Sequence, residues 1–197
     1  GQSQDLIKED FELKALNMMV GLSNVKQNII TTFNRLKICV ERRRLGLKVK
    51  GGECHHMLFT GNPGTGKTTV AKMMGRIYRS LGLLSKGDVV FVDRGKIVGS
   101  YIGDTERNMQ RILQEARGNI LFIDEAYALA RKGMDNDFGR EAIDTLVKLM
   151  EDNRDDLVVI VAGYTDEMHD FLTSNPGLIS RFNKYIDFPD YTDDELM

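Results

Sequence analysis

The sequence predicts an α/β fold with a parallel sheet between layers of helices. Short, nearly continuous apolar runs typical of buried strands alternate along the chain with stretches of helical periodicity. A glycine-rich segment, residues 61–68, joins the first of these runs to a helix. A strand, a glycine-rich loop and a helix in this order are typical of phosphate-binding sites at the edge of a parallel sheet. We therefore expect an α/β domain of the P-loop type.

The overall composition favours one soluble domain. With 197 residues, 42% of them hydrophobic, the chain is long enough for one substantial core. Its 27 basic and 29 acidic residues give a net charge of -2, which argues against a nucleic-acid partner. No apolar run approaches the roughly 18 residues needed to span a bilayer, and the first residues lack a signal-peptide profile. These features predict a soluble intracellular protein without a membrane partner. The cytoplasm is favoured, and the nucleus or an organelle stroma would also suit it.

The first elements of the chain are expected to be helical. Residues 1–15 form an N-terminal extension, with a weakly amphipathic helical pattern over 6–16. A long helix should follow, with Ser23 as its N-cap and a basic last turn, 42–44, closed by Gly46. The residues of its broad apolar face are Val25, Ile29, Ile30, Phe33, Leu36, Ile38 and Val40.

Strands and helices alternate over the remainder of the chain. Strands are expected at 57–60, 89–92, 120–123, 157–162 and, as a shorter one, 184–188. Helices are expected at 67–81, closed by Gly82, at 105–117, closed by Gly118, and at 141–151. The absence of repeats and of an obvious linker predicts that these elements form a single unit.

The glycine-rich segment reads GNPGTGKT and matches the phosphate-loop pattern GxxxxGK followed by Ser or Thr. Its glycines let the backbone curl with the N–H groups pointing inward, where they can cradle phosphate oxygens. Lys67 would then reach the β- and γ-phosphates, and the hydroxyl of Thr68 would bind Mg²⁺ at the positive end of a helix. We therefore expect ATP and Mg²⁺ as ligands. The expected nucleotide contacts in this loop are Asn62, Pro63, Gly64, Thr65, Gly66, Lys67, Thr68 and Thr69.

Two consecutive carboxylates follow the apolar strand at 120–123, the form of a Walker B element. Asp124 is expected to hold Mg²⁺ through its water shell, and Glu125 to orient or deprotonate the attacking water. Kinases of small metabolites place a hydroxyl acceptor at this point, whereas a glutamate favours water as the acceptor. The pair therefore predicts an ATPase.

Two further polar residues are candidates for the site. Thr165 follows the strand at 157–162, where a polar side chain would lie beside the γ-phosphate as a sensor. Alternatively Thr165 caps the helix that begins at Asp166, and both roles can coexist. Arg181 has no obvious partner in its own chain. It is either a surface arginine or an arginine finger that completes the site of a neighbouring subunit.

A loop after the second strand places an aromatic and an aliphatic residue between glycines, in VGSYIG at 98–103. Such a pattern is unexpected in a solvated turn. On its own it indicates either a packed loop or a binding device.

Several segments in order resemble the AAA+ ATPases of the CbxX/CfqX branch, which includes the red-type Rubisco activases and the stage V sporulation protein K group. These segments are HMLFTGNPGTGKTTVAKMMGRIYRSLGLL, VGSYIGDT, ILFIDEAYALAR, DFGREAIDTLVKLMED, VVIVAGYTDEM and NPGLISRFNKYIDFPDY. The resemblance covers residues 16–197 and implies an ATP-driven ring, usually a hexamer of identical subunits, that remodels a protein substrate. It also implies the strand order 5-1-4-3-2.

The same resemblance assigns roles to residues that carry no motif of their own. Met19, Val20 and Gly21 would line the adenine pocket, and residues 131–138 would lie near a second pore loop. The residues of the first pore loop, which grips polypeptide, would be Tyr101, Ile102 and Gly103. It also strengthens Thr165 as the sensor and Arg181 as the finger.

The chain departs from the family pattern in two respects. Ile179 stands where relatives often carry a further arginine, so Arg181 must act unaided. The sequence ends at Met197, where a helical lid is expected to begin, so residues 16–197 correspond to the large subdomain alone. A helicase or clamp loader is the alternative function; Tyr101 and the acidic net charge disfavour it. A scaffold that binds ATP without hydrolysis is disfavoured by Glu125 and Arg181.

Overall fold

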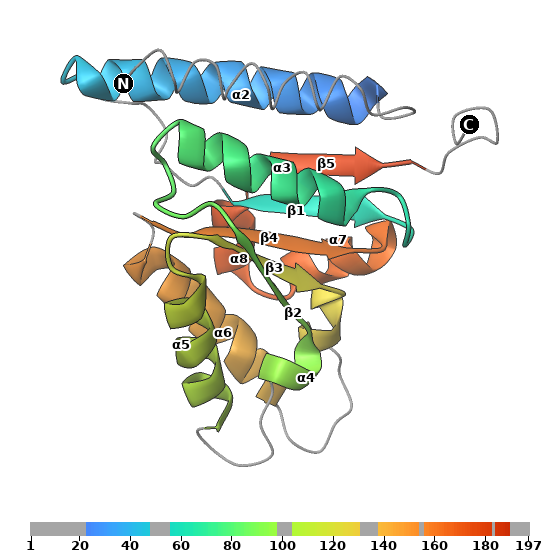
Figure 1. Ribbon diagram of the computed structural model, residues 1–197. Coiled ribbons are helices and arrows are strands. Elements are labelled where there is room, and N and C mark those ends of the chain that lie inside the picture. The colour runs from blue at the N-terminus through green and yellow to red at the C-terminus, as the bar shows by residue number, and fades with distance from the viewer. Residues whose placement is uncertain are drawn as a thin grey trace.

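The computed structural model describes residues 23–47, 56–97, 104–130, 138–153, 156–182 and 184–189. These residues form a five-stranded parallel sheet with helices on both faces, which confirms the predicted class (Figure 1). The strands are β1 (Met57–Gly61), β2 (Val89–Val92), β3 (Ile120–Asp124), β4 (Val158–Gly163) and β5 (Lys184–Phe188). They lie in the order β2-β3-β4-β1-β5, which is the expected order read from the other edge.

The longer helices agree with the sequence-based expectation to within a few residues. They are α2 (Ser23–Arg44), α3 (Lys67–Ser80), α5 (Asp104–Ala116), α6 (Phe138–Asp152) and α7 (Thr165–Thr173). Three short helices were not predicted, because four to six residues are too few to show a helical period. They are α4 (Arg94–Ile97), the 3-10 helix η1 (Ala126–Ala130) and α8 (Pro176–Arg181). The expected extension at 1–15 and the helix at 6–16 lie outside the described residues.

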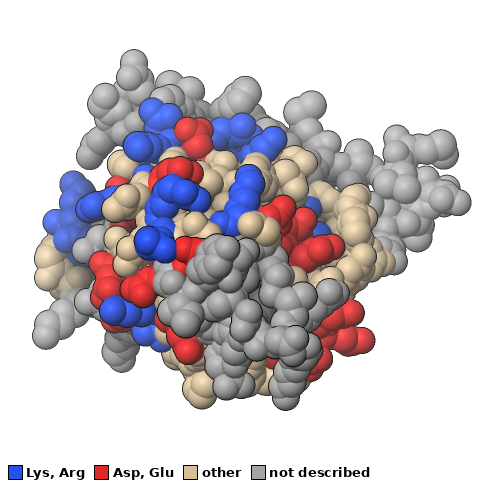
Figure 2. Space-filling view, turned by 90° about the horizontal axis from the view of Figure 1, so that it is seen from below, with Lys and Arg blue, Asp and Glu red and all other residues tan. Residues whose placement is uncertain are grey.

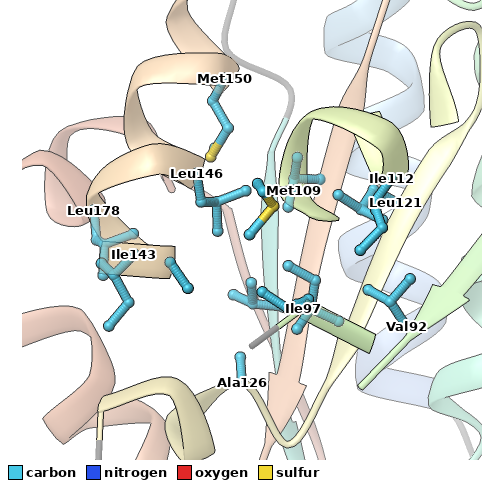
Figure 3. Close-up of a cluster of buried hydrophobic side chains, with 14 of the residues drawn as sticks. Val92, Ile97, Met109, Ile112, Leu121, Ala126, Ile143, Leu146, Met150 and Leu178 are labelled. Atoms are coloured by element: carbon cyan, nitrogen blue, oxygen red, sulfur yellow. The ribbon is translucent and has the colours of Figure 1, made fainter. Parts of the chain in front are cut away.

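Alternate residues of each buried strand face two separate cores, as the two-residue period of a strand requires. In β1, Met57 and Phe59 join the core beneath α2 and α3, whereas Leu58 joins the core beneath α5, α6, α7 and α8. Figure 1 shows α2 and α3 on one side of the sheet and α5 and α6 on the other. In Figure 3, Met109 of α5 and Leu146 of α6 converge near Leu121 of β3. Because both faces are covered, polar groups of the strands reach solvent mainly at the strand ends.

Helix α2 has the expected length but a narrower apolar face. Its buried residues are Val25, Ile29, Phe33 and Leu36. The inclusion of Ile38 was wrong, because this side chain is 55% exposed. Two residues beyond Leu36 correspond to about 200° around a helix, so Ile38 faces away from the sheet. The expected stop at Gly46 is confirmed, since its φ of 73° is left-handed and its N–H bonds to the carbonyl of Arg43 at 2.9 Å.

Helix α2 packs against β5, and Lys184 at the start of that strand is partly buried. Burial lowers the pKa of the Lys184 amine from 10.5 to about 8, and the positive charge of Arg35 adds to the shift while Cys39 opposes it. Between about 8 and 10.5 the unfolded chain therefore binds more protons at this lysine than the folded chain does. Its charge destabilises the fold below pH 8, and this destabilisation fades as the pH rises through the window.

We expect Lys184→Met to stabilise the protein in a pH-dependent manner. The gain in the free energy of unfolding should be about 1–3 kcal/mol at pH 7 and should shrink towards zero by about pH 10.5. Urea denaturation across this pH range measures it. Lys148→Met, on the exposed face of α6, is the matched control and should change the free energy by less than about 0.5 kcal/mol. A gain from Lys184→Met that does not depend on pH would contradict this account.

Candidate functional site

The carboxyl ends of β1, β3 and β4 meet at one edge of the sheet and form a pocket of about 380 Å³. The glycine-rich loop leaves β1 and enters α3 along one wall. The end of β3 and the residues after β4 form the opposite wall. The lining residues are Gly61, Pro63, Gly64, Gly66, Lys67, Thr68, Thr69, Phe122, Asp124, Glu125, Gly163 and Tyr164. The structure thus brings together most of the residues that the phosphate-loop and Walker B patterns single out.

The loop has a shape that other residues would not readily adopt. Gly61 has a φ of 142°, and a Cβ there would collide with the carbonyl oxygen of Phe188 in β5. Gly66, the N-cap of α3, has a φ of 96° in the left-handed region. Between them, the hydroxyl of Thr65 donates to the carbonyl of Asn62 at 2.7 Å. Because Gly66 supplies no capping side chain, the first amides of α3 are suited to an anion in the pocket.

Lys67 lines the pocket as the first residue of α3. Its Nζ donates to the carbonyl of Gly61 at 2.7 Å. Burial lowers the pKa of the Lys67 amine, and the negative charges of Asp124 and Glu125 oppose that shift. The amine is therefore close enough to both carboxylates to respond to their charge.

The two carboxylates leave the sheet on a strained turn. Oδ1 of Asp124 accepts a hydrogen bond from the backbone N–H of Glu125 at 3.0 Å. Glu125 has a φ of 49°, and within the described ranges it is the non-glycine residue with a left-handed backbone. Such a conformation costs about 1–2 kcal/mol, and strain of this kind concentrates at functional sites. It turns the chain sharply into η1, where Ala126 is buried, so both acidic side chains stay exposed at the pocket.

The donor set suits a cation that shares its ligands with a phosphate. No group of three or more His, Cys, Asp or Glu side chains that could hold a metal occurs among the described residues. Mg²⁺ does not need such a group, because it is usually bound by one or two carboxylates, phosphate oxygens and waters. Asp124 and the hydroxyl of Thr68, which both line the pocket, are oxygen ligands of that kind.

The structure favours Tyr164 over Thr165 at the pocket wall. Tyr164 lines the pocket, whereas Thr165 is exposed and is not among the lining residues. The alternative that Thr165 caps the following helix is wrong, because α7 begins at Thr165 and its N-cap is Tyr164. Tyr164 was not among the predicted site residues, since an aromatic residue after a buried strand usually indicates packing. Its ring does lie near that of Tyr127, with centroids 6.5 Å apart.

Arg181 lies at the opposite edge of the sheet from the pocket. It ends α8, just before β5, whose first residue pairs with Met57 at the start of β1. The loop of the pocket follows the other end of β1, and a strand of five residues is about 16 Å long. An arginine in this place is too far away to serve its own pocket. The expectation that it has no partner in its own chain was wrong, because its Nη2 lies 3.2 Å from Oε2 of Glu151.

Several predicted site residues cannot be compared with the structure. Met19, Val20 and Gly21 lie outside the described residues, as do the segments 98–103 and 131–137. The roles expected of Tyr101, Ile102 and Gly103 therefore stay predictions.

Among the residues that are described, no helix is both long enough and apolar enough to cross a membrane. Basic and acidic side chains interleave on the face that Figure 2 shows.

Comparison with known families identifies the class of protein to which this fold and pocket belong. The model of the ATPase family associated with various cellular activities (AAA) matches residues 57–190. This match covers more than half of the chain, so the chain belongs to the AAA family. Its P-loop type of fold and its parallel sheet are those that the sequence predicted.

Individual relatives place the chain within the branch named from its sequence. It is 48% identical over 184 residues to stage V sporulation protein K of Bacillus subtilis, covering 93% of this chain and 56% of that protein. Protein CbbX of Cereibacter sphaeroides is 49% identical over 178 residues, or 90% of this chain and 57% of CbbX. The chloroplastic ribulose bisphosphate carboxylase/oxygenase activase of Cyanidioschyzon merolae is 48% identical over 179 residues, or 91% and 61%. The chain thus spans a little over half the length of these relatives.

A solved structure supports the fold at greater sequence distance. The AAA domain of FIGL-1, crystallised with ADP, aligns with a TM-score of 0.60 at 16% identity. The alignment covers 90% of this chain and 56% of that one. At this identity the likeness shows the fold alone.

We expect Asp124→Asn to lower the pKa of the Lys67 amine further below its ordinary range. The reason is that the substitution removes one of the two charges that oppose the effect of burial. The ¹³Cε shift of Lys67, followed against pH in lysine-labelled protein, measures this pKa. Asp170→Asn, at an exposed position of α7, is the control and should leave it unchanged. An unchanged or raised pKa in Asp124→Asn would show that the two side chains do not interact across the pocket.

Proposed function

We propose that this chain is the ATP-binding and ATP-hydrolysing part of a ring-forming AAA+ protein that remodels a protein substrate. The observation that carries this proposal is the pocket, which combines a glycine loop and a lysine on one wall with two exposed carboxylates on the other. A loop of this kind suits the phosphates of a nucleotide. The carboxylates suit a metal ion and a water molecule.

Each residue of the pocket has a role that follows from its chemistry. The loop amides and Lys67 would bind the phosphate oxygens, with the Lys67 amine exchanging the carbonyl of Gly61 for a phosphate. Thr68 and Asp124 would hold Mg²⁺, which neutralises charge on the phosphates. Glu125 would orient the attacking water and accept its proton.

Tyr164 and Thr165 are the two candidates for the sensor, and the pocket wall carries the phenol of Tyr164. Tyr164 lies on the wall and is a hydrogen-bond donor. We assign the contact with the γ-phosphate to Tyr164 in preference to its neighbour Thr165. The adenine contacts of Met19, Val20 and Gly21 remain as the resemblance implies them.

The use of ATP energy on a protein is proposed from the relatives and from the pore-loop pattern. One relative is by name the activase of an enzyme, which is itself a protein. Tyr101, Ile102 and Gly103 would grip a polypeptide in the ring. The position of Arg181, remote from its own pocket, supports a site shared between identical subunits, with a hexamer expected in the full-length protein.

Glu125→Gln should abolish turnover while leaving ATP binding largely intact. The amide retains the size of the side chain but cannot accept the proton of the attacking water, so we expect a loss of about 100-fold or more. Phosphate release and titration with a fluorescent ATP analogue, both in the full-length protein, measure the two properties. Glu115→Gln, on the exposed face of α5, serves as the control. Full turnover in Glu125→Gln would overturn the assignment of the base.

Mixing two inactive variants tests whether the site is shared between subunits. Arg181→Ala should lower turnover by about 10³-fold or more, the usual effect of losing an arginine finger. In a mixture with Glu125→Gln, some interfaces combine an intact Glu125 from one subunit with an intact Arg181 from the next. For equal amounts and random assembly, about a quarter of the wild-type rate should return, because head-to-tail interfaces pair independently. If the mixture stays inactive, Arg181 does not act in trans.

A further inference from the structure

The side chain of Arg181 forms hydrogen bonds within its own chain, although it is not among the residues that line the pocket. Its Nη2 donates to Oε2 of Glu151 at 3.2 Å, and its Nη1 donates to the carbonyl of Gly177 at 3.1 Å. The Arg181 side chain is 21% exposed, and that of Glu151 is 49% exposed. The guanidinium is thus folded back along α8 towards α6.

Glu151 occupies this place because α6 and α8 are docked along a defined stripe. Asp144, Val147 and Glu151 are spaced by three and four residues, so they share one face of α6. At the start of α8, Nδ2 of Asn175 donates to Oδ1 of Asp144 at 2.8 Å. In the middle, a Cβ on Gly177 would press on Cγ1 of Val147, so the glycine allows the close approach. Glu151 is therefore held opposite the end of α8, where Arg181 is found.

The guanidinium of Arg181 is committed to acceptors of its own chain. Arginine binds phosphate most strongly through two parallel N–H groups, either Nη1 with Nη2 or Nε with Nη2. Nε is buried and has no hydrogen-bond partner among the described residues, so the edge formed by Nε and Nη2 is closed. At the other edge, Nη2 already donates to Glu151 and Nη1 to the carbonyl of Gly177. In this conformation a phosphate from another subunit would have to compete with these acceptors for Arg181.

We propose that Glu151 is a positioning residue that holds Arg181 in this retracted conformation, from which a nucleotide in the neighbouring subunit must draw it. The inference rests on the proposed function, in which Arg181 acts in trans. The retracted conformation is only weakly stabilised, for two reasons. A half-exposed ion pair contributes little, and the buried Nε–H lacks the acceptor that a phosphate would supply. A polyphosphate, with several negative charges, competes well with a single carboxylate.

The proposal predicts a particular kinetic signature for Glu151→Gln in the full-length protein. Gln keeps the size of the side chain but removes the charge that holds the guanidinium. Only the conformation in which Arg181 is released from Glu151 can bind the nucleotide of the neighbouring subunit. The apparent KM for ATP should therefore fall about two- to fivefold, while kcat stays unchanged. A merely structural role would lower kcat or the melting temperature instead. Glu151→Ala, which removes the acceptor altogether, should lower KM at least as much, and Glu115→Gln should not.

A double variant and a spectroscopic measurement separate this proposal from the proposed function. Adding Glu151→Gln to Arg181→Ala should have no further effect on turnover. In the 197-residue chain, the Nε–Hε signal of Arg181, identified by its loss in Arg181→Lys, should exchange slowly with solvent. In Glu151→Gln, the chemical shift and the exchange rate of this signal should approach those of the exposed arginines.

The results separate a failure of the arginine-finger assignment from a failure of the role proposed for Glu151. Full turnover in Arg181→Ala would refute the finger, while the Nε–Hε signal would still report the retracted conformation. A lowered kcat or an unchanged KM in Glu151→Gln would overturn the proposal for Glu151, as would a rapidly exchanging Nε–Hε in the wild-type chain.

Discussion

The parallel pairing of β1 between β4 and β5 is the constraint on which the rest of the structure depends. Because all neighbours run in the same direction, the carboxyl ends of β1, β3 and β4 are brought to one edge. The register sets the glycine loop after β1 beside the residues after β4, since Thr60 pairs with Gly163. It also sets Asp124 opposite Ala162. Residues more than 50 positions apart in sequence thereby form a single pocket.

The same pairing places Arg181 too far from the pocket of its own subunit to contact a ligand there. Since β5 runs parallel to β1, the chain must return to the amino edge before β5 begins, and α8 ends there. A residue on that return lies about one strand length from the pocket. The sheet thus separates the arginine from the nucleotide site within one chain, and the proposed assembly reunites them. The contact with Glu151 gives the isolated subunit a place to hold the charge.

Local sequence patterns were sufficient for the strands, the main helices, and the phosphate-loop and carboxylate residues that line the pocket. Each of these depends on neighbours within about ten residues, and the strand order came from the family resemblance. What the sequence did not reveal depends on tertiary contacts. Glu151 meets Arg181 across 30 residues, and no local pattern joins them. The choice between Tyr164 and Thr165 depends on where α7 begins, a difference of one residue, and the narrower face of α2 depends on which residues the sheet covers.

In the proposed site, the loop between β1 and α3 binds phosphate through its backbone amides. Amide hydrogen exchange can be measured residue by residue with saturating Mg²⁺ and a non-hydrolysable ATP analogue. Exchange should slow at Gly64, Gly66 and Lys67, with no comparable change at Tyr185 on the exposed side of β5. Binding of the analogue without slower exchange in the loop would contradict it.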